Sequence, residues 1–559
     1  MNLYMIKKIL ILFVGFNSIP VFSNDLLGNQ LFSPISESRR ALQNNNREIE
    51  QLSDKGQTER LIKNKEEKKL IAENILPDSS MCLEISNVFL QGITLLDNDD
   101  LDRITALPTQ CITTKYLNTL ARELTQIYIN KGYITSRIEF IQPNDQGELG
   151  VQVIEGFIEG IKGSDHKVNP YFIFPGFVNK PLRLQDLDQG LDQANRLQSN
   201  QVTLDILPGK YKGGSIIILN NKYSSPWSAI ASIDNYGQEN TGKWLSRATF
   251  SVDSPLGISD FISLNASTTL EPYSNKYSRA YNLFYSLPYG DFTFSSFYSY
   301  SEYLIKQPLQ NTIITLSGET QQYGIKSDYL YYRDQNDLLT ISGQLANKQV
   351  KNFLLDSLLF VSSPELTVLE LSLNHSHIFS TSVLSSNLSI ERGLSIFGFD
   401  DKRNIIDNEF SKLKLSFNYS YSFSVFDFIY QSNNQLFAQY SPNVLPGIEW
   451  LSLTDRSAVR GFSNTSISGD NGWYLRNTLS HYYFINSAVI QPRLGIDVGQ
   501  VYPHGESQGN STVIGMSTGI SLNYKKIMFD MDISHGKVVS GLVSKNEPIT
   551  ALFNVTYKI

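Results

Sequence analysis

Two short patterns in the sequence have residue types and spacings that could carry chemistry. In the first, one residue separates His375 from His377, so both rings would lie on one face of a strand, a placement that metal sites use. The pair, however, continues the alternation of Leu369, Leu371 and Leu373 to the end of an expected strand, and no cysteine accompanies it. We therefore predict an interfacial histidine pair, with no metal and no other cofactor.

The second pattern is Gly515-Met516-Ser517-Thr518-Gly519, which matches the Gly-x-Ser-x-Gly signature of serine hydrolases. That signature requires a sharp turn from a strand into a helix around the serine. Here Ile514, Met516 and Ile520 keep a period of two through the match, which is typical of an uninterrupted strand. We predict that Ser517 is one more polar residue on a strand face and that the protein is not an enzyme.

The strands that would carry these residues share a period of two from Pro226 to the C-terminus. Between Lys412 and Val425, for example, Leu, Phe and Tyr alternate with Ser, Asn and Lys. One apolar and one strongly polar face suits a wall between lipid and a wet lumen. A soluble β-sandwich of these 334 residues would be far above the usual ~100. We predict a transmembrane β-barrel over residues 223–559, with an even number of antiparallel strands near 16 at about 21 residues per strand and connection.

The composition excludes several other classes of protein. Of the 559 residues, 12% are aromatic and 18% are charged, so an intrinsically disordered chain is not indicated. The net charge of -7 gives no basic footprint, which argues against a nucleic-acid partner. The sequence also has no repeated apolar runs of about 18 residues or more, which membrane helices would need.

Residues 1–23 have the pattern of a cleaved export signal. Basic residues ending at Lys8 precede the apolar stretch Ile9–Phe16, which is too short to cross a bilayer core roughly 30 Å thick. Export would place the mature chain in an oxidising compartment. The two cysteines, Cys82 and Cys111, are enough there for one disulfide bond.

Residues 24–80 are expected to contain a helix and a linker. Arg, Lys, Glu, Gln and Asn dominate from Glu37 to Glu73, and no aromatic residue occurs there. Ser33 and Pro34 form a good N-cap and first helical position, and a second charged helix is predicted from Thr58 to about Asn74. An exposed linker stays an alternative for much of this region.

Between Cys82 and Asn221, the order strand, helix, strand, strand occurs twice, which indicates a repeated small α/β module. We assign the first copy to residues 81–155 and the second to residues 156–222. The predicted elements are a strand Leu83–Leu90, a helix Thr113–Lys131 and strands Ser136–Ile141 and Glu148–Ile154, then a strand Phe157–Ile161, a helix Leu184–Leu197 and strands Val202–Leu207 and Ser215–Leu219.

A signal, a charged helix, two small modules and a barrel together resemble the transporters of two-partner secretion, the TpsB family, along the whole mature chain. The first module is similar to that family's first POTRA domain in its paired cysteines, in Lys131–Thr135 and in Val153–Gly156. The second is similar to the next POTRA domain in Pro181–Leu184 and in Asn195–Asn200. Gln185 departs from the family, which usually has Arg at that position.

The strongest single motif is Val459-Arg460-Gly461-Phe462, which resembles the tip of the family's sixth extracellular loop, folded back into the barrel. Its partner in the family is a Gly-x-Asp on the inner wall, and Gly495-Ile496-Asp497 matches it, with Gly499 close by. Strand parity supports the match, because the alternation of apolar residues leaves Asp497 facing the lumen. Arg460 could then donate two parallel charge-assisted hydrogen bonds to Asp497, and Gly495 and Gly499 would leave space for the loop.

The resemblance implies a passive transporter in the outer membrane of a Gram-negative cell, with its POTRA domains in the periplasm. These domains would capture an unfolded exoprotein that carries an N-terminal secretion domain, by adding its strands to exposed sheet edges. The exoprotein, a haemolysin, an adhesin or a contact-dependent toxin, would leave through a monomeric barrel that sits in outer-membrane lipid. A helix between Asn29 and Asp54 would plug the resting pore.

Two other functions compete with secretion. An outer-membrane assembly factor of the BamA type shares the Arg-Gly-Phe loop but typically carries more POTRA domains than fit between Cys82 and Asn221. A barrel enzyme or a plain porin would have no use for two such modules. We therefore predict a secretion transporter.

Overall fold

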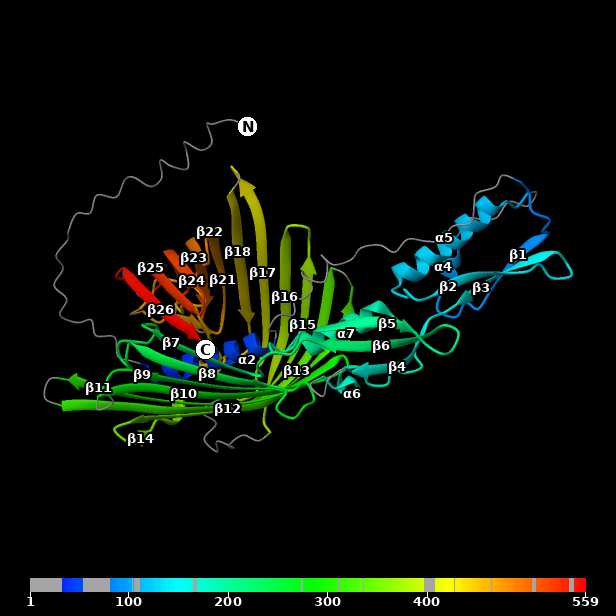
Figure 1. The fold of residues 1–559 in the computed structure, drawn as a ribbon. Helices are drawn as coiled ribbons and strands as arrows, with labels where there is room; N and C mark the ends of the chain where they lie inside the picture. The colour runs from blue at the N-terminus through cyan, green and yellow to red at the C-terminus, as the bar shows by residue number, and fades with distance from the viewer. Residues whose placement is uncertain are drawn as a thin grey trace. The chain divides into compact units, whose positions relative to one another are not determined.

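The fold is described from a computed structural model (Figure 1). The structure describes residues 33–53, 81–102, 104, 111–163, 168–272, 275–309, 312–334, 336–396, 408–426, 428–463, 465–504, 509–541 and 547–559. The predicted signal over residues 1–23 and the predicted second charged helix from Thr58 to Asn74 lie outside these residues. Among the helices in the described ranges, none is both long enough and apolar enough to span a bilayer.

Two small sheets precede the barrel, and both have the strand order first, third, second. In each sheet the central strand is parallel to the first strand and antiparallel to the second. The first module contains β1 (Asn87–Gln91), α4 (Asn98–Leu101), α5 (Thr114–Asn130), β2 (Arg137–Ile141) and β3 (Glu148–Ile154). The second contains β4 (Phe157–Gly163), α6 (Pro170–Ile173), α7 (Leu184–Asn195), β5 (Val202–Pro208) and β6 (Gly214–Asn221). The predicted repetition of the module is therefore present.

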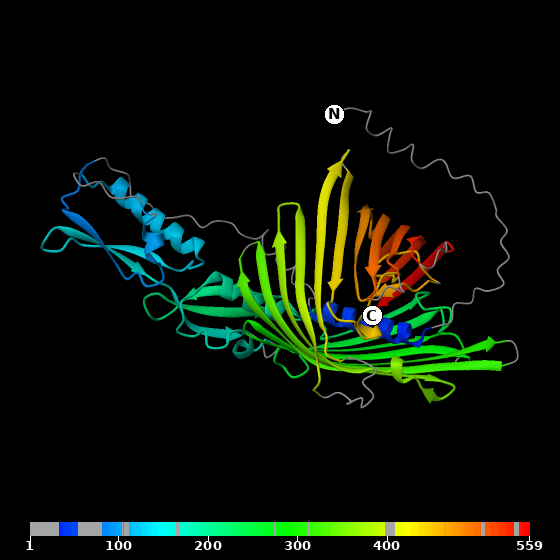
Figure 2. The same ribbon diagram turned by 180° about the vertical axis from the view of Figure 1, so that it is seen from behind.

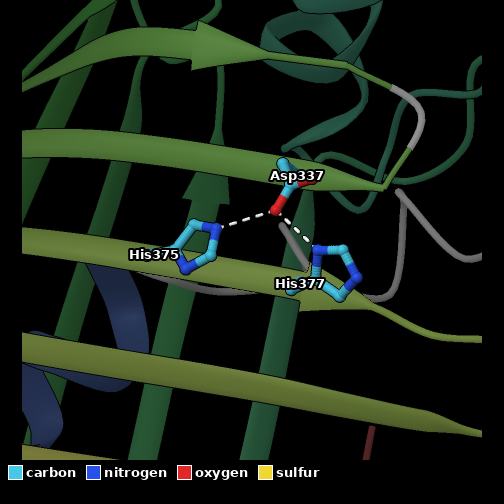
Figure 3. Close-up of side chains that lie close together, drawn as sticks. All are labelled: Asp337, His375 and His377. Atoms are coloured by element: carbon cyan, nitrogen blue, oxygen red, sulfur yellow. Dashed lines mark hydrogen bonds and ion pairs between the residues drawn. The ribbon is translucent and has the colours of Figure 1, made fainter.

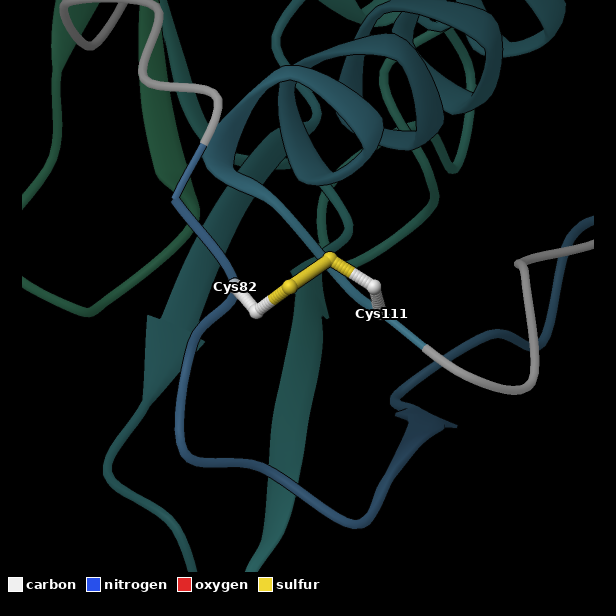
Figure 4. Close-up of a disulfide and its surroundings, with 2 residues drawn as sticks. All are labelled: Cys82 and Cys111. Carbon is white, nitrogen blue, oxygen red and sulfur yellow. A yellow bond between two sulfur atoms is a disulfide. The ribbon is translucent and has the colours of Figure 1, made fainter.

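The first predicted strand is wrong at its start. Leu83 does not join the sheet, because its amide donates to the carbonyl of Ile112 at 2.8 Å and the chain there is held beside the start of α5. Cys82 and Cys111 form a disulfide bond at the same place (Figure 4). Regular pairing with β3 therefore begins only at Asn87.

The barrel closes through sixteen long antiparallel strands, with β26 pairing with β7. These are β7 (Trp227–Asp234), β8 (Leu245–Asp253), β9 (Phe261–Thr269), β10 (Lys276–Tyr289), β11 (Phe292–Leu309), β12 (Thr312–Arg333), β13 (Asp337–Leu354), β15 (Glu365–Ile378), β16 (Ser382–Leu394), β17 (Ser411–Val425), β18 (Phe428–Tyr440), β21 (Asn471–His481), β23 (Ala488–Tyr502), β24 (Ser511–Tyr524), β25 (Ile527–Ser540) and β26 (Thr550–Lys558). The short β14 (Ser357–Leu358) and β22 (Tyr483–Ile485) extend β13 and the β21–β23 connection. The predicted number of strands is confirmed.

The two faces of the wall follow the alternation in the sequence. On β23, Leu494 and Ile496 are 60% and 61% exposed, whereas Asp497, the residue after Ile496, is 1% exposed. The apolar face is the outer wall and the polar face lines the lumen, as a barrel in lipid requires.

Helix α2 (Pro34–Ser53) lies inside the barrel (Figure 2). Its Leu42 packs against Val350, Leu366 and Val368 of the wall. Its Ile49 belongs to a second apolar cluster that includes residues of β9, β10 and β11. The helix is therefore enclosed by strands that are more than two hundred residues away in the sequence.

Candidate functional site

The lumen holds two segments that are not part of the barrel wall. One is α2, and the other is the connection between β18 and β21, residues 441–470, which we call the inward loop. The inward loop contains η3 (Gly447–Glu449) and a hairpin of β19 (Leu451–Ser452) and β20 (Ser468–Gly469). Because both segments lie in the lumen that the strands enclose, their anchoring decides how much of it is open.

The tip of the inward loop is bound to the wall by Arg460 and Asp497. Arg460 Nε donates to Asp497 Oδ2 at 2.7 Å, and Arg460 Nη2 donates to Asp497 Oδ1 at 2.6 Å. The backbone amide of Arg460 donates to the same carboxylate at 3.0 Å, and Nη2 also donates to the carbonyl of Asn477 at 2.8 Å. Arg460 is 8% exposed and Asp497 is 1% exposed. This is the two-pronged geometry that only a guanidinium can supply.

Glycines of the wall form the surface on which this tip lies. A Cβ added to Gly495 would come within 2.3 Å of Arg460 Nη2, and one on Gly499 within 2.4 Å of Leu453 Cδ1. Gly515 and Gly536 are equally close, because their added Cβ atoms would meet the Arg460 carbonyl oxygen at 2.2 Å and the Phe462 ring at 2.6 Å. Larger side chains at these positions would push the loop away from the wall.

Sequence reasoning missed Gly515 and Gly536. Gly515 opens the Gly-x-Ser-x-Gly match, and strand parity already placed it on the face of Ser517, toward the lumen. The match therefore includes part of the surface under the loop. Ser517 lies opposite Ser534 in the strand register, and the neighbouring His535 belongs to the other, outer face.

Apolar packing surrounds the charged pair at the loop tip. Val459, only 1% exposed, joins a cluster with Val501 of β23, Val513 of β24 and Val538 of β25. Gly461 adopts a φ of +95°, a left-handed conformation that favours glycine. In the motif, Val459 thus supplies an apolar anchor and Arg460 an ionic anchor, and Gly461 makes the turn that leads to Phe462.

The base of the inward loop has a second ionic anchor that sequence reasoning also missed. Glu449 Oε1 accepts from Lys348 Nζ at 2.6 Å and Glu449 Oε2 from Lys412 Nζ at 2.7 Å. Lys412 also lies 2.8 Å from Glu391, which pairs in turn with Lys414. The available signal was the alternation of lysines with leucines at the start of β17, which places charge on the lumen face.

Helix α2 is bound to the wall mainly through single hydrogen bonds, two between neutral groups and two to carboxylates. These hydrogen bonds join Ser38 Oγ to Asn352 Oδ1 (3.2 Å), Gln322 Nε2 to Asn46 Oδ1 (2.7 Å), Asn282 Nδ2 to Glu48 Oε2 (2.6 Å) and Ser53 Oγ to Asp328 Oδ2 (3.1 Å). Each bond involves a different strand position, so the helix is held along its length by separate single contacts.

Arginines of α2 contact the inward loop. Arg39 Nε donates to the carbonyl of Gly447 at 2.5 Å, and its guanidinium lies over the Trp450 ring, 5.4 Å from the centroid. Arg40 and Arg47 reach Asp455 at 3.7 and 3.5 Å, longer than a hydrogen-bonded ion pair. The loop therefore forms one side of the space that α2 occupies.

The second module is joined to the barrel by the motif Asn195–Asn200. Arg196 Nη2 donates to the carbonyl of Ser259 at 3.0 Å, and the amide of Ser199 donates to Asp253 Oδ2 at 2.7 Å. Earlier on α7, Asp192 pairs with Arg333 at the end of β12. The residues of this motif that resemble the POTRA family thus lie at the contact with the barrel. We call the end of the barrel that carries this contact the module end.

Leu197 of the same motif reaches the cluster around Ile49 of α2. Both side chains pack with Phe261, Phe284 and Phe297 of the wall. Module, helix and barrel therefore share one apolar cluster.

The departure from the family at Gln185 also has a structural position. A Cβ on Gly132 would come within 2.7 Å of the Gln185 amide carbon, and the amide of Leu184 donates to the Gly132 carbonyl at 2.8 Å. Gln185 therefore lies where the two modules meet.

His375 and His377 lie away from the lumen, on the outer wall near the module end. Asp337 of the neighbouring strand β13 lies between the two rings (Figure 3). This carboxylate was not part of the predicted interfacial pair.

Comparisons with known proteins address the whole chain. The family model described as haemolysin secretion/activation protein ShlB/FhaC/HecB matches residues 213–522. A POTRA domain of the ShlB type matches residues 83–156, and a further POTRA domain matches residues 157–208.

Similar proteins cover almost the full length. The haemolysin transporter ShlB of Serratia marcescens is 48% identical over 94% of both chains, and the haemolysin transporter HpmB of Proteus mirabilis is 46% identical over 94% of both. The outer membrane transporter CdiB of Escherichia coli O6:K15:H31 is 32% identical over 79% of this chain and 76% of its own. Among solved structures, CdiB from Escherichia coli superposes with a TM-score of 0.83 and 27% identity over 95% of this chain and 100% of that chain.

Proposed function

The chain belongs to the haemolysin secretion/activation protein family, and it is an outer-membrane transporter that secretes an exoprotein through a barrel with periplasmic POTRA domains; we propose that this exoprotein is a haemolysin. The observation that supports this cargo is the difference between relatives. The two proteins named haemolysin transporters are 48% and 46% identical to the chain, whereas the CdiB relative is 32% identical. Adhesins and contact-dependent toxins are the alternative cargoes.

Cargo choice can be tested by co-expression. The N-terminal secretion domains of a haemolysin, an adhesin and a contact-dependent toxin are each expressed with the full chain, and the amount in the medium is measured. We expect the haemolysin domain to be secreted in clear excess over the other two. Equal secretion of all three, or preference for another domain, would contradict the proposed cargo while leaving the transporter function intact.

We propose the domain borders that the sequence predicted: signal 1–23, helix and linker 24–80, first POTRA domain 81–155, second POTRA domain 156–222 and barrel 223–559. The support comes from the start of β4 at Phe157 and of β7 at Trp227. A barrel that closes on its own strands supports a monomeric pore.

In the proposed resting state, α2 plugs the pore and the inward loop is locked to the wall. The exoprotein would first add strands to the edges of the POTRA sheets, which are β1 and β2 in the first module and β4 and β5 in the second. On β4 the available part lies beyond Ile158, because the start of this strand already pairs with residues 179–182. Helix α2 would then leave the lumen, and the unfolded exoprotein would pass beside the locked loop. The charged and amide side chains of α2 suit both the wet lumen and the periplasm into which the helix would withdraw.

The first POTRA domain can be tested separately as the receptor. Removal of residues 81–155 should abolish capture of the exoprotein's secretion domain by the purified transporter, because two of the four sheet edges are lost. Pull-down with immobilised transporter measures this, and a transporter with both cysteines replaced by serine serves as a control that keeps the edges. Undiminished capture by the deletion variant would refute the receptor role.

A further inference from the structure

Asp337, His375 and His377 form a compact cluster on the outer wall of the barrel. Asp337 begins β13, and the two histidines lie near the end of β15. In the register, Asp337 stands opposite His377 and Leu339 stands opposite His375, so the three side chains occupy adjacent positions of one face. That face is the outer one, because Ile341 and Leu373 of the same parity are 43% and 42% exposed.

The donor atoms of the cluster converge. Asp337 Oδ1 lies 2.8 Å from His375 Nε2 and 2.6 Å from His377 Nδ1. One ligand atom from each of the three residues lies within 4.8 Å of those from the others. The three side chains are between 25% and 39% exposed and lie where β13 begins and β15 ends, at the module end, so an ion can reach them from the water beside that end of the barrel. Figure 3 shows both rings turned toward the carboxylate.

The backbone around Asp337 is fixed by the turn between β12 and β13. Asp334 Oδ1 accepts from the amides of Asn336 and Asp337, both at 2.7 Å. The amide of Asp334 donates to the carbonyl of Asp337 at 3.0 Å, and the amide of Ile378 donates to the carbonyl of Asn336 at 2.8 Å. The carboxylate and the two rings are therefore held by paired backbone on both strands.

We propose that Asp337, His375 and His377 bind a divalent transition-metal ion, with Zn²⁺ as the best match and water completing the coordination. Two imidazoles and one carboxylate are a common ligand set for Zn²⁺, at about 2.0–2.2 Å from the metal. Tetrahedral geometry at such distances separates ligand atoms by roughly 3.3 Å, so each ring needs to move by less than about 1 Å from its present position. Mg²⁺ and Ca²⁺ prefer oxygen ligands, and the two imidazoles therefore select against them.

Binding changes the protonation of the two rings. An ionised carboxylate only accepts hydrogen bonds, so an ionised Asp337 requires a proton on each ring nitrogen that faces it. A metal ion takes the lone pairs of the same nitrogens, His375 Nε2 and His377 Nδ1. Each ring proton then moves through water to the far nitrogen of its ring or is released.

His481 shows what an ordinary interfacial histidine looks like in this barrel. It ends β21, also at the module end, and its Nδ1 bonds to the carbonyl of Ile429 at 2.6 Å. Its ring packs edge-on against Tyr483, with centroids 4.2 Å apart. No carboxylate is among the described contacts of His481. The sequence could not separate the two cases, because the third ligand comes from another strand, 38 residues before His375.

The proposed ion would join β13 to β15 next to the contact between the barrel and the second POTRA domain. Arg333, which pairs with Asp192 of the second POTRA domain, ends β12 just before the same turn. Occupancy of the site would therefore stiffen the part of the barrel rim to which that domain attaches.

The test uses the full chain, purified in detergent without a polyhistidine tag. Zn²⁺ is titrated in competition with a chromophoric chelator, and Co²⁺ is added to a parallel sample to record visible absorption from a metal with nitrogen and oxygen ligands. The variants are Asp337→Asn, the double variant His375→Gln with His377→Gln, and His481→Gln as the matched control. Heat-modifiable migration in gels shows that each barrel is folded.

We expect a single Zn²⁺ per wild-type chain, the same binding in His481→Gln, and a loss of affinity of about tenfold or more in the double variant. Asp337→Asn should weaken binding and change the Co²⁺ spectrum. Zn²⁺ uptake that is equal in the wild type and the folded double variant, or absent from the wild type, would overturn the proposal and return the cluster to an interfacial histidine pair.

Discussion

The inward loop and helix α2 occupy the same lumen but are held there by different kinds of interaction. The loop is anchored by buried ion pairs at its tip and its base, Arg460 with Asp497 and Glu449 with two lysines. Helix α2 is held by single hydrogen bonds to amide, hydroxyl and carboxylate groups, by the contacts of Arg39 with the inward loop, by two apolar clusters and by ion pairs to Asp455 that are 3.5 and 3.7 Å long. None of these contacts is a buried, two-pronged ion pair. Breaking a buried ion pair costs about 3–5 kcal/mol, whereas a neutral hydrogen bond contributes only about 0.5–1.5 kcal/mol.

If α2 is the plug and the inward loop is the lock, as proposed above, this difference would account for one segment that leaves the pore and one that stays. If the loop left, Asp497 would lose the three hydrogen bonds that it accepts from Arg460. When α2 leaves, water can replace each of its amide and hydroxyl partners one by one. In this proposal the type of contact, and not the number of contacts, distinguishes the inward loop from α2.

The largest expected effect comes from the loop tip. Arg460→Ala or Asp497→Ala should lower secretion by about tenfold or more, because each leaves a buried charge without its partner. Arg460→Lys is the matched control, since it keeps the charge and loses the two-pronged geometry, and it should secrete at an intermediate level. Exoprotein in the medium and heat-modifiable barrel in the membrane are measured together. Normal secretion from both alanine variants would contradict the role of the Arg460–Asp497 pair as a lock.

An intermediate effect is expected for α2. Ile49→Asp places a carboxylate in the cluster with Phe261 and Phe284, and burial of an unpaired charge there should expel the helix. Conductance of the barrel in planar bilayers should rise severalfold while secretion continues. Asn44→Asp adds the same charge on an exposed position of the same helix and should leave conductance unchanged. A closed pore in the Ile49 variant would contradict the plug role.

The smallest effect is a pH dependence of plugging. Helix α2 crosses no lipid, and burial of its Glu48 raises the pKa of this carboxyl to about 7, against the opposing effects of the Asn282 hydrogen bond and of Arg247. After withdrawal the pKa would return to its ordinary value near 4.5. The plugged state therefore binds the extra proton, its stabilisation is complete below about pH 4.5, and it is lost as the pH rises to about 7.

Conductance between pH 5 and pH 8 measures this effect. The open fraction of the wild type should increase a few-fold over that range, because Glu48 is only half-buried and partly screened. Glu48→Gln should show a flat profile at the low-conductance level. Secretion, which depends on the Arg460–Asp497 pair, should not change with pH in either protein. A loss of secretion with the same pH dependence as the conductance would contradict the distinction between lock and plug.

Much of the fold was readable from local patterns. The period of two in β15, β17 and β23 predicted the barrel, the faces of its wall and the lumen position of Asp497, because a strand repeats every two residues regardless of its partners. The repeated order of elements predicted both modules. These patterns are local, so they can be recognised in the sequence without knowing which residues are in contact.

The parts that sequence reasoning missed depend on pairing between distant strands. Gly515 and Gly536 have a reason to be glycine only when the loop tip lies on them. Glu449 becomes an anchor only beside Lys348, about one hundred residues earlier in the chain. Asp337 likewise gives no signal in the sequence beyond an acidic residue at the start of a strand. Only the pairing of β13 with β15 brings two imidazoles to it.

The cluster shared by Ile49, Leu197, Phe261, Phe284 and Phe297 has a consequence for inheritance. Its members, which also include Ala346 of β13, come from the N-terminal helix, the second POTRA domain and four barrel strands, which recombination could otherwise exchange as separate units. A chimera that takes only the barrel from a relative would set foreign side chains against a native helix and a native domain. We therefore expect functional exchange between lineages to work best when residues 34–53, the second POTRA domain and the strands of this cluster are inherited together.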